Sequence, residues 1–333
     1  MKTKILKLSA ICASLLAMSS INAQTVGFEL TPTSGNPTSD IIMSINSSSP
    51  VMGVRSTSPS VGNNTIPVKI DVTNTGGLAY GIYKTSTMDN LIISNDIYAN
   101  ASGTAYAVYN SGGYTVMQGN ITISAKGTAS AYAFSGSSLS LQGTGGTHTI
   151  IGGVYSVGMN INTGTYIWDS YDSDILWYIG SSDLIIHSSV TIEFMKALRI
   201  ANISSPAIRF LGNMSFHTSD ISESVLSVNS MHIHSSARFT VILDDGFEAF
   251  ENDEMSIWSG SSIASGAFDS SNVSIVLSST GESLTYGDDF TVSATGVVTF
   301  LTDVSVVAIP EPSTYAMIFG VLALGLAIYR RRK

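Results

Sequence analysis

Cysteine is almost absent from this chain of 333 residues, and its single copy, Cys12, lies close to the N-terminus. The rest of the chain therefore has no thiol for a disulfide framework, a covalent nucleophile or a cysteine-based metal site. Its stability must come from packing and from backbone hydrogen bonds.

Charged residues are also scarce, at 12% of the chain, and positive charge is the scarcer sign. Residues 24–309 hold 8 of the 15 Lys and Arg but 23 of the 24 Asp and Glu, which leaves a formal charge of −15. Such a surface repels phosphate backbones, so we expect no nucleic-acid partner. Ser, Thr, Gly and Asn abound instead, which is typical of exported β-rich proteins.

The chain lacks the common catalytic motifs, including Gly-x-Ser-x-Gly, His-Glu-x-x-His, the P-loop and the dinucleotide fingerprint. The nearest grouping is Glu193, Lys196 and Arg199, whose spacing predicts one short helical turn with ion pairs inside it. His232 and His234 lie two residues apart, a spacing that puts both on one strand face. Without a third ligand nearby, they indicate surface histidines rather than half of a zinc or copper site. We expect a non-catalytic protein without a cofactor.

Acidic residues gather in two places. Asp169, Asp172 and Asp174 form a turn too irregular for an EF-hand loop. A second cluster follows at residues 244–254, where close carboxylates need either water or a bound cation. A solvated turn is the simpler interpretation. The alternative is a weak calcium site, whose candidate ligands are Asp244, Asp245, Glu248 and Glu251.

The N-terminus has the pattern of a secretory signal peptide over residues 1–23. Three lysines precede an apolar stretch at residues 8–18, and small residues follow before Gln24. This order predicts cleavage between Ala23 and Gln24 and export of the remainder.

The C-terminus, residues 310–333, has the composition of a sorting segment. The extended, acidic Pro310, Glu311 and Pro312 precede an apolar run at residues 315–329. As a helix these 15 residues rise roughly 22 Å, which is shorter than a hydrocarbon core of about 30 Å. The run therefore spans only with bilayer thinning or snorkelling. The four cations that follow should stay cytoplasmic. They are Arg330, Arg331, Arg332 and Lys333.

In this order the tail resembles the PEP-CTERM sorting signal of exosortase substrates. The resemblance covers residues 309–333 only. It implies a Gram-negative bacterium that makes exopolysaccharide, an inner-membrane intermediate, and exosortase action near Pro310-Glu311-Pro312. An ordinary tail anchor or a buried helix is the alternative, but neither accounts for the Pro-Glu-Pro break beside four cations.

Internal repeats govern the expected fold. Gly77-Leu78-Ala79-Tyr80-Gly81-Ile82-Tyr83 returns as Gly103-Thr104-Ala105-Tyr106-Ala107-Val108-Tyr109, and weaker copies begin at Ala131 and Val154. The alanines at 79, 105 and 131 are 26 residues apart, and each unit holds about three short strands. This period predicts an all-β protein built as a right-handed parallel β-solenoid, or β-helix. An antiparallel sandwich with coincidental repeats is the alternative.

Within the repeats, small and large residues alternate with the period of a strand. We expect the larger set, Tyr80 with Ile82 and their equivalents, to point inward and to form ladders. The opposite assignment is the alternative. The repeats also resemble the passengers of autotransporter-type surface proteins.

The expected organisation has five parts. They are a signal peptide (1–23), an N-terminal cap or loose arm (24–64), the repeat solenoid (65–182), a C-terminal β-rich solenoid or cap (183–309) and the sorting signal with its transmembrane helix (310–333). Together they predict an exported surface or matrix protein of structural or adhesive function, with exopolysaccharide as an expected partner. The alternatives are a β-helix polysaccharide lyase or hydrolase, and a permanently anchored membrane protein that faces the periplasm.

Overall fold

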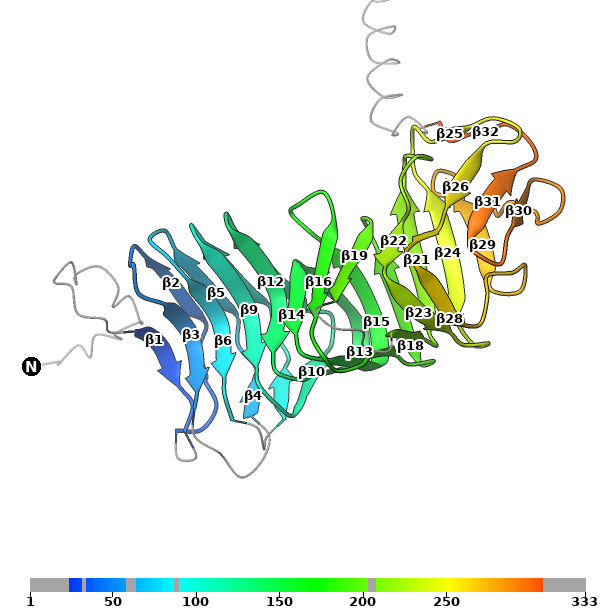
Figure 1. Cartoon of the computed structure of the whole chain (residues 1–333). Helices are drawn as coiled ribbons and strands as arrows, with labels where there is room; N and C mark the ends of the chain where they lie inside the picture. Colours follow the sequence, from blue (N-terminus) through cyan, green and yellow to red (C-terminus); the bar gives the residue numbers. More distant parts are fainter. Residues whose placement is uncertain (1–23, 32–33, 58–63, 87–89, 203–207, 308–333) are drawn as a thin grey trace, which may run out of the picture.

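The computed structural model describes residues 24–31, 34–57, 64–86, 90–202 and 208–307. Within these ranges the secondary structure is β-strands joined by turns, with no α-helix. The strands stack into an elongated parallel β-solenoid (Figure 1), so the expected all-β solenoid is confirmed. The signal peptide and the sorting tail lie outside the described residues. In the part of the chain that is described, no helix is long and apolar enough to cross a membrane.

One wall of the solenoid is a ten-stranded parallel sheet, called the tyrosine sheet below, to which each coil contributes one strand. Its first pair is β1 with β3, and each later strand pairs in parallel with the one before it. In order, its strands are β1 (Thr25–Glu29), β3 (Val51–Ser56), β6 (Ala79–Lys84), β9 (Thr104–Asn110), β12 (Ser130–Gly136), β14 (Gly153–Ser156), β16 (Ile175–Ile179), β19 (Leu198–Asn202), β22 (Leu226–Val228) and β27 (Trp258–Ser259).

The remaining wall is a 17-stranded sheet made of two parallel ladders. The long strands β13 (Leu139–Ile151) and β15 (Met159–Asp169) run through both ladders. The first ladder also contains β2 (Ile41–Ile45), β5 (Ile70–Asn74), β8 (Ile97–Ala101), β11 (Thr122–Gly127), β18 (Val190–Phe194), β21 (Asn213–Thr218), β24 (Arg238–Leu243) and β29 (Val273–Leu277). The second contains β4 (Asn64–Ile66), β7 (Leu91–Ile93), β10 (Tyr114–Gln118), β17 (Leu184–Ile186), β20 (Ile208–Phe210), β23 (Ser230–Ile233) and β28 (Ser262–Ser265).

The repeat words lie in register, because Ala79 pairs with Ala105 and Ala105 pairs with Ala131. The expected start of the solenoid at residue 65 is wrong, however. Parallel pairing already begins at Thr25, opposite Val51. The strands β1 and β2 carry no Ala-Tyr word, and the turns between them are rich in Ser, Thr and Pro, so the sequence did not indicate them. The pairing also continues beyond residue 160, where the repeat words fade, and across the expected boundary at residue 183.

The expected orientation of the repeat residues is wrong for the tyrosines. Tyr80, Tyr106 and Tyr132 lie half-buried on the outside of the solenoid, whereas Ala79 and Ile82 are fully buried. The strict alternation fails because Gly81 and Ile82 are both buried, so the strand changes parity between them. The interior has no room for a ring at this point. A Cβ placed on Gly81 would lie 2.6 Å from the carbonyl oxygen of Ala107.

The interior is one continuous hydrophobic core that becomes aromatic midway along the axis. Trp168 packs against Trp177, with ring centroids 4.8 Å apart, and Trp177 packs against Phe194. Phe194 then stacks on Phe216 at 5.1 Å. Ladders of identical or similar side chains in successive coils are what stabilises a stack whose units contact only their neighbours.

The solenoid ends in short antiparallel strands at one end of the molecule (Figure 1). β25 (Glu248–Ala249) pairs with β32 (Val304–Ser305), while β26 (Glu254–Ser256) and β30 (Phe290–Val292) both pair with β31 (Val297–Phe300). Phe247 and Phe300 form part of the core here. A change from parallel to antiparallel pairing ends the repeat, which limits edge-to-edge association with further strands.

Candidate functional site

The most regular surface feature is a double row of tyrosines on the outside of the tyrosine sheet. In one row Tyr80 stacks on Tyr106 with centroids 4.9 Å apart, and Tyr106 stacks on Tyr132 at 5.5 Å. In the other row Tyr83 stacks on Tyr109, again at 4.9 Å. In each row the repeat places one ring on a coil, and parallel pairing brings the equivalent rings of neighbouring coils together.

Stacking decides which atoms of these rings meet solvent. Because each ring covers the face of the next, the rows present mainly ring edges and phenol hydroxyls. Burial, followed by the neighbouring phenols, raises the pKa of Tyr80 to about 12. Burial also raises the pKa of Tyr106 and Tyr109. These hydroxyls are therefore neutral near pH 7, where each can both donate and accept a hydrogen bond.

The first row breaks at β14, because the residue opposite Tyr132 in the next coil is Gly153. Across this break the ring of Tyr132 contacts the tilted ring of Tyr155, with centroids 5.7 Å apart, and the edge-on ring of Tyr178 at 6.2 Å. Tyr155 is 49% exposed. A hollow of about 120 Å³ opens at the break. Its lining residues are Ala129, Ser130, Ala131, Tyr132, Gly153, Ser170, Asp172, Leu176 and Tyr178.

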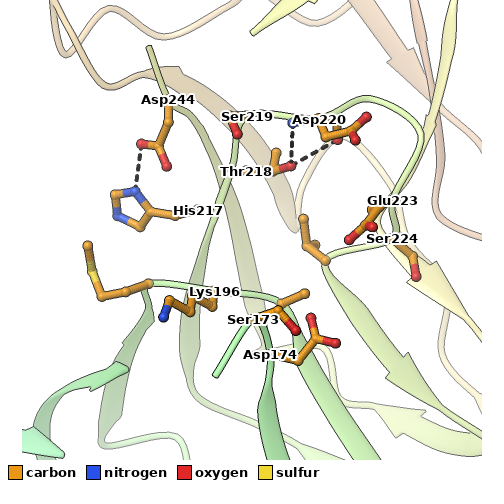
Figure 2. A pocket seen from close by; sticks show the side chains of 13 residues that line it. Ser173, Asp174, Lys196, His217, Thr218, Ser219, Asp220, Glu223, Ser224 and Asp244 are labelled. Atoms are coloured by element: carbon orange, nitrogen blue, oxygen red, sulfur yellow. Dashed lines mark hydrogen bonds and ion pairs between the residues drawn. The ribbon is translucent and has the colours of Figure 1, made fainter. Parts of the chain in front are cut away.

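A second candidate site surrounds His217 in β21. The imidazole lies between carboxylates from the two adjacent coils. Its Nε2 is 2.9 Å from Oε1 of Glu193, and its Nδ1 is 2.8 Å from Oδ1 of Asp244. Figure 2 shows the second of these contacts from the side of the neighbouring hollow. The ring is only 11% exposed, so three successive coils are joined by one nearly buried side chain.

Opposing effects act on the pKa of His217. Burial lowers it, but the hydrogen bonds and charges of Glu193 and Asp244 outweigh that effect, so the pKa is raised overall. Both ring nitrogens are engaged by carboxylates. The imidazole therefore offers a substrate neither a free lone pair nor a free N–H, and it acts as a link between coils rather than as a general base.

The hollow beside His217 has a volume of about 190 Å³ (Figure 2). Acidic, basic and hydroxyl side chains line most of it. The residues are Ser173, Asp174, Met195, Lys196, Ala197, His217, Thr218, Ser219, Asp220, Glu223, Ser224, Val225 and Asp244. The carboxylate of Asp220 accepts hydrogen bonds from the amide and the hydroxyl of Ser222. These hydrogen bonds hold the pKa of Asp220 below its usual value.

The expected helical turn with internal ion pairs is wrong. Glu193 lies in β18 and Arg199 in β19, with a bend between them. The charges pair across coils instead of within one element. Lys196 lies 3.6 Å from Asp169, and Arg199 lies 3.5 Å from Asp174. The three-residue spacing does not indicate a helix here, because Glu193, Lys196 and Arg199 lie at a corner of the solenoid, where the chain turns from one wall to the next.

The other predicted site residues are not brought together. His232 and His234 each contact a serine hydroxyl, of Ser265 and Ser236. The calcium candidates Asp244, Asp245, Glu248 and Glu251 do not converge, since Asp244 turns to His217. Among the described residues no three Asp, Glu, His or Cys side chains are grouped so as to hold a metal ion.

The residues proposed for sorting and cleavage lie mostly outside the described ranges. These are Pro310, Glu311, Pro312, the four terminal cations and Ala23. Gln24 is the first described residue, and its Oε1 accepts a hydrogen bond from Nη1 of Arg55.

Sequence reasoning missed the His217 link, although a signal for it was present. Glu193 and Asp244 lie 24 and 27 residues from His217, close to the repeat length. Residues one repeat apart stack in a solenoid, so this spacing could have predicted the cluster.

Comparisons with known proteins add no relative. No family model, curated protein or solved structure matches this chain.

Proposed function

We propose that this chain is an exported, non-catalytic protein of the cell surface or extracellular matrix. In this proposal the N-terminal signal directs export, and the C-terminal helix retains the chain in the inner membrane until an exosortase acts near Pro310-Glu311-Pro312. The solenoid then serves as a structural or adhesive element in contact with exopolysaccharide. The proposal needs no cofactor and no nucleic-acid partner.

The observation that carries the proposal is the order of segments at the C-terminus. A Pro-Glu-Pro break, an apolar run shorter than a hydrocarbon core requires and four consecutive cations follow one another in the sequence. A permanent anchor does not require the break, whereas a cleaved signal needs an extended substrate. The lysine-led apolar stretch before Ala23 supports the same route.

The fold supports the proposed structural or adhesive role of the solenoid. From β1 to β29 each coil is bonded to its neighbours by parallel ladders, which favours a stiff rod. The tyrosine rows give this rod a repeating face of hydroxyls at the spacing of the coils. We also propose the right-handed sense for the coils, because parallel crossover connections are right-handed in about 98% of cases.

The test follows the tagged full chain in a host that carries an exosortase. We expect mass spectrometry of the surface fraction to show a chain that ends near residue 312 and lacks Arg330–Lys333. Replacing Pro310, Glu311 and Pro312 by alanine should leave the intact chain in the membrane fraction, whereas the control variant Ser313→Ala should be processed. An intact C-terminus on surface protein, or the same trimmed form from cells without exosortase, would refute the proposal.

The hollow beside His217 favours a second candidate, a polysaccharide lyase or hydrolase. Carboxylates of Asp174, Glu223 and Asp244 line this hollow together with Lys196, and such enzymes use paired carboxylates or an acid beside a base. Arg199, however, pairs with both Asp174 and Glu223, which reduces the freedom of two of these acids. Release of reducing ends or unsaturated sugars from mixed polysaccharides, lost in Asp174→Asn, would establish the enzyme.

Permanent anchoring in the membrane is the alternative hypothesis for the C-terminal segment. It predicts that the full-length chain stays in the detergent-soluble membrane fraction whether or not exosortase is present.

A further inference from the structure

We propose that the N-terminal end of the solenoid is an interface on which a second copy of this chain docks head to head. We call this end the open end and define it by strands β1 and β2 of the first coil, with their inward-facing residues Phe28, Ile41, Met43 and Ile45. The inference rests on the proposed cleavage before Gln24. It goes beyond the proposed function because it names a partner and the surface that this partner covers.

Both strands of the first coil have one edge without a partner strand. Within the described residues, β1 pairs only with β3, and β2 pairs only with β5. The backbone N–H and C=O groups along the other edge of each strand are therefore available to a further strand. In the coils that follow, the same edges bind the preceding coil. The parallel ladders thus stop at the open end with half of their bonding capacity unused.

The hydrophobic core is also open at this end. Ile41 and Met43 pack against the core but are only partly buried. Their partners in the next coil, Ile70 and Val72, are fully buried because the first coil covers them. Phe28 in β1 is likewise only partly buried. A surface that covered these side chains would gain the free energy of apolar burial.

The open end lacks the features that usually keep edge strands from pairing. Such strands commonly carry lysine, proline or a β-bulge. In contrast, β2 reads Ile-Ile-Met-Ser-Ile and pairs with β5 in an uninterrupted register. Its outward-facing Ile42 is 68% exposed. The far end of the solenoid is different, because antiparallel strands close it (Figure 1).

The charge of the first coil allows two copies to approach each other at this end. Residues 24–57 contain one base, Arg55, and two acids, Glu29 and Asp40, so their formal charge is 1 − 2 = −1. The exported part of the chain as a whole carries −15. Glu29 is paired with Arg55 at 2.6 Å, and Oδ1 of Asp40 accepts a hydrogen bond from the Lys69 amide. Two open ends therefore repel each other far less than other parts of the surface do.

Symmetry makes a second copy a matching partner and limits the assembly to two. An interface that uses the same surface on both partners closes after two copies. The capped C-terminal end offers no equivalent edge, so stacking does not continue into a fibre. In an antiparallel pairing of two β2 strands about Met43, Ile41 lies opposite Ile45, and Ile42 lies opposite Ser44. Apolar residues thus meet on the inward face, and no like charges are brought together.

Sedimentation equilibrium of the exported chain tests the inference. Density-matched detergent allows the chain to be measured with or without its C-terminal segment. We expect the mass of two chains at about 50 µM and dissociation on dilution. Met43→Lys leaves its cation within reach of water in the monomer but buries it unpaired in the dimer, so it should raise the dissociation constant at least about tenfold.

Phe250→Lys is the matched control, because it makes the same kind of change at an exposed residue of the capped end. It should alter the dissociation constant by less than about twofold. The circular dichroism of both variants should match that of the parent. This comparison separates loss of the interface from damage to the fold.

Distances between spin labels distinguish head-to-head docking from other dimers. The chain cleaved before Gln24 has no cysteine, so a single label can be attached at Ser44→Cys in β2 or at Ser305→Cys in β32. Ten strands make nine steps of about 4.8 Å, so head-to-head docking places the two capped ends roughly 90 Å apart. Pulsed electron paramagnetic resonance should therefore detect coupling between labels at position 44 and none between labels at position 305.

The outcomes keep this inference separate from the proposed function. A dimer that Met43→Lys leaves intact, coupling at position 305 instead of 44, or growth beyond two chains would overturn the inference. A monomer at about 50 µM would also overturn it, and a monomer that retains residues 1–23 would assign the open end to that segment instead. N-terminal sequencing and mass spectrometry of the C-terminus report on cleavage and exosortase processing in the same preparation, whatever its mass.

Discussion

His217 should make the stability of this solenoid depend on pH in a defined direction. The perturbation is His217→Ala, which removes the ring that joins Glu193 and Asp244 across three coils. Because the fold raises the pKa of His217, its stabilising contribution is fully present below the unfolded-state value of about 6.5. It is lost as the pH rises through the folded-state pKa. Above that pH one ring nitrogen has no proton, so only one carboxylate can accept a hydrogen bond from the ring.

The magnitude follows from the two contacts. A hydrogen bond to a charged group contributes about 1.5–3 kcal/mol when it is protected from water. The carboxylates of Glu193 and Asp244 are 38% and 35% exposed, so water screens both of them. Discounting for that exposure leaves about 1–2 kcal/mol for the protonated ring. In the variant, both carboxylates are rehydrated, which keeps the loss within this range.

Urea unfolding of the parent and the variant at pH 5.5, 7.0 and 8.5 measures the effect. The difference in unfolding free energy between the two should be largest at pH 5.5 and should shrink at pH 8.5. Taking the difference cancels the titration of the other acids. His232→Ala is the matched control, because the His232 ring hydrogen-bonds the hydroxyl of Ser265 and forms no ion pair with any residue that the structure describes. Its difference should stay within about 0.5 kcal/mol at every pH. A difference that is constant with pH, or largest at pH 8.5, would refute the reasoning.

Three further outcomes follow from the packing. Phe216→Ala should lower the free energy of unfolding in urea by about 3–5 kcal/mol, because loss of the buried ring leaves a cavity in the aromatic ladder. Phe250 is exposed, so Phe250→Ala should lower it by less than about 0.5 kcal/mol. Equal losses in the two variants would contradict the placement of Phe216 in the core. Gly81→Val should prevent the coils from stacking, since a Cβ would already lie 2.6 Å from the Ala107 carbonyl oxygen, and a variant with parental circular dichroism and melting temperature would contradict this. Alkaline titration at 295 nm should show part of the tyrosine absorbance changing near pH 12, and Tyr80→Phe should reduce that part. Because the fold raises the pKa of Tyr80, the stabilising contribution of its neutral phenol is complete below pH about 10 and is lost as the pH rises through about 12.

Much of the fold could be predicted because a solenoid repeats locally. Three short strands per unit and a constant spacing of the Ala-Tyr words are sufficient to indicate parallel stacking, and the pairing of Ala79 with Ala105 confirms it. The start at Thr25 could not be predicted in the same way. The first strands lack the Ala-Tyr word, and their turns are composed of residues that also form unstructured arms.

The orientation of the tyrosines is the clearest failure of pattern reasoning. Alternation assumes that a strand keeps its parity, but Gly81 and Ile82 both face the interior. The Ile97 side chain from the opposite wall fills the space above Gly81, so only small residues fit there. The space available to a side chain depends on which residues of the opposite wall face it in the coil's cross-section. The spacing of residues along one strand does not reveal this.

The chain's own sequence determined the repeat, the absence of disulfides, the negative charge and the composition of both ends. Tertiary structure alone decided that the tyrosines line the outside, that Gly153 interrupts their row and that His217 meets two carboxylates from other coils. The physical reason is one of range. Composition and strand period act between near neighbours, whereas register across coils is set by how residues some two dozen positions apart pack on one another.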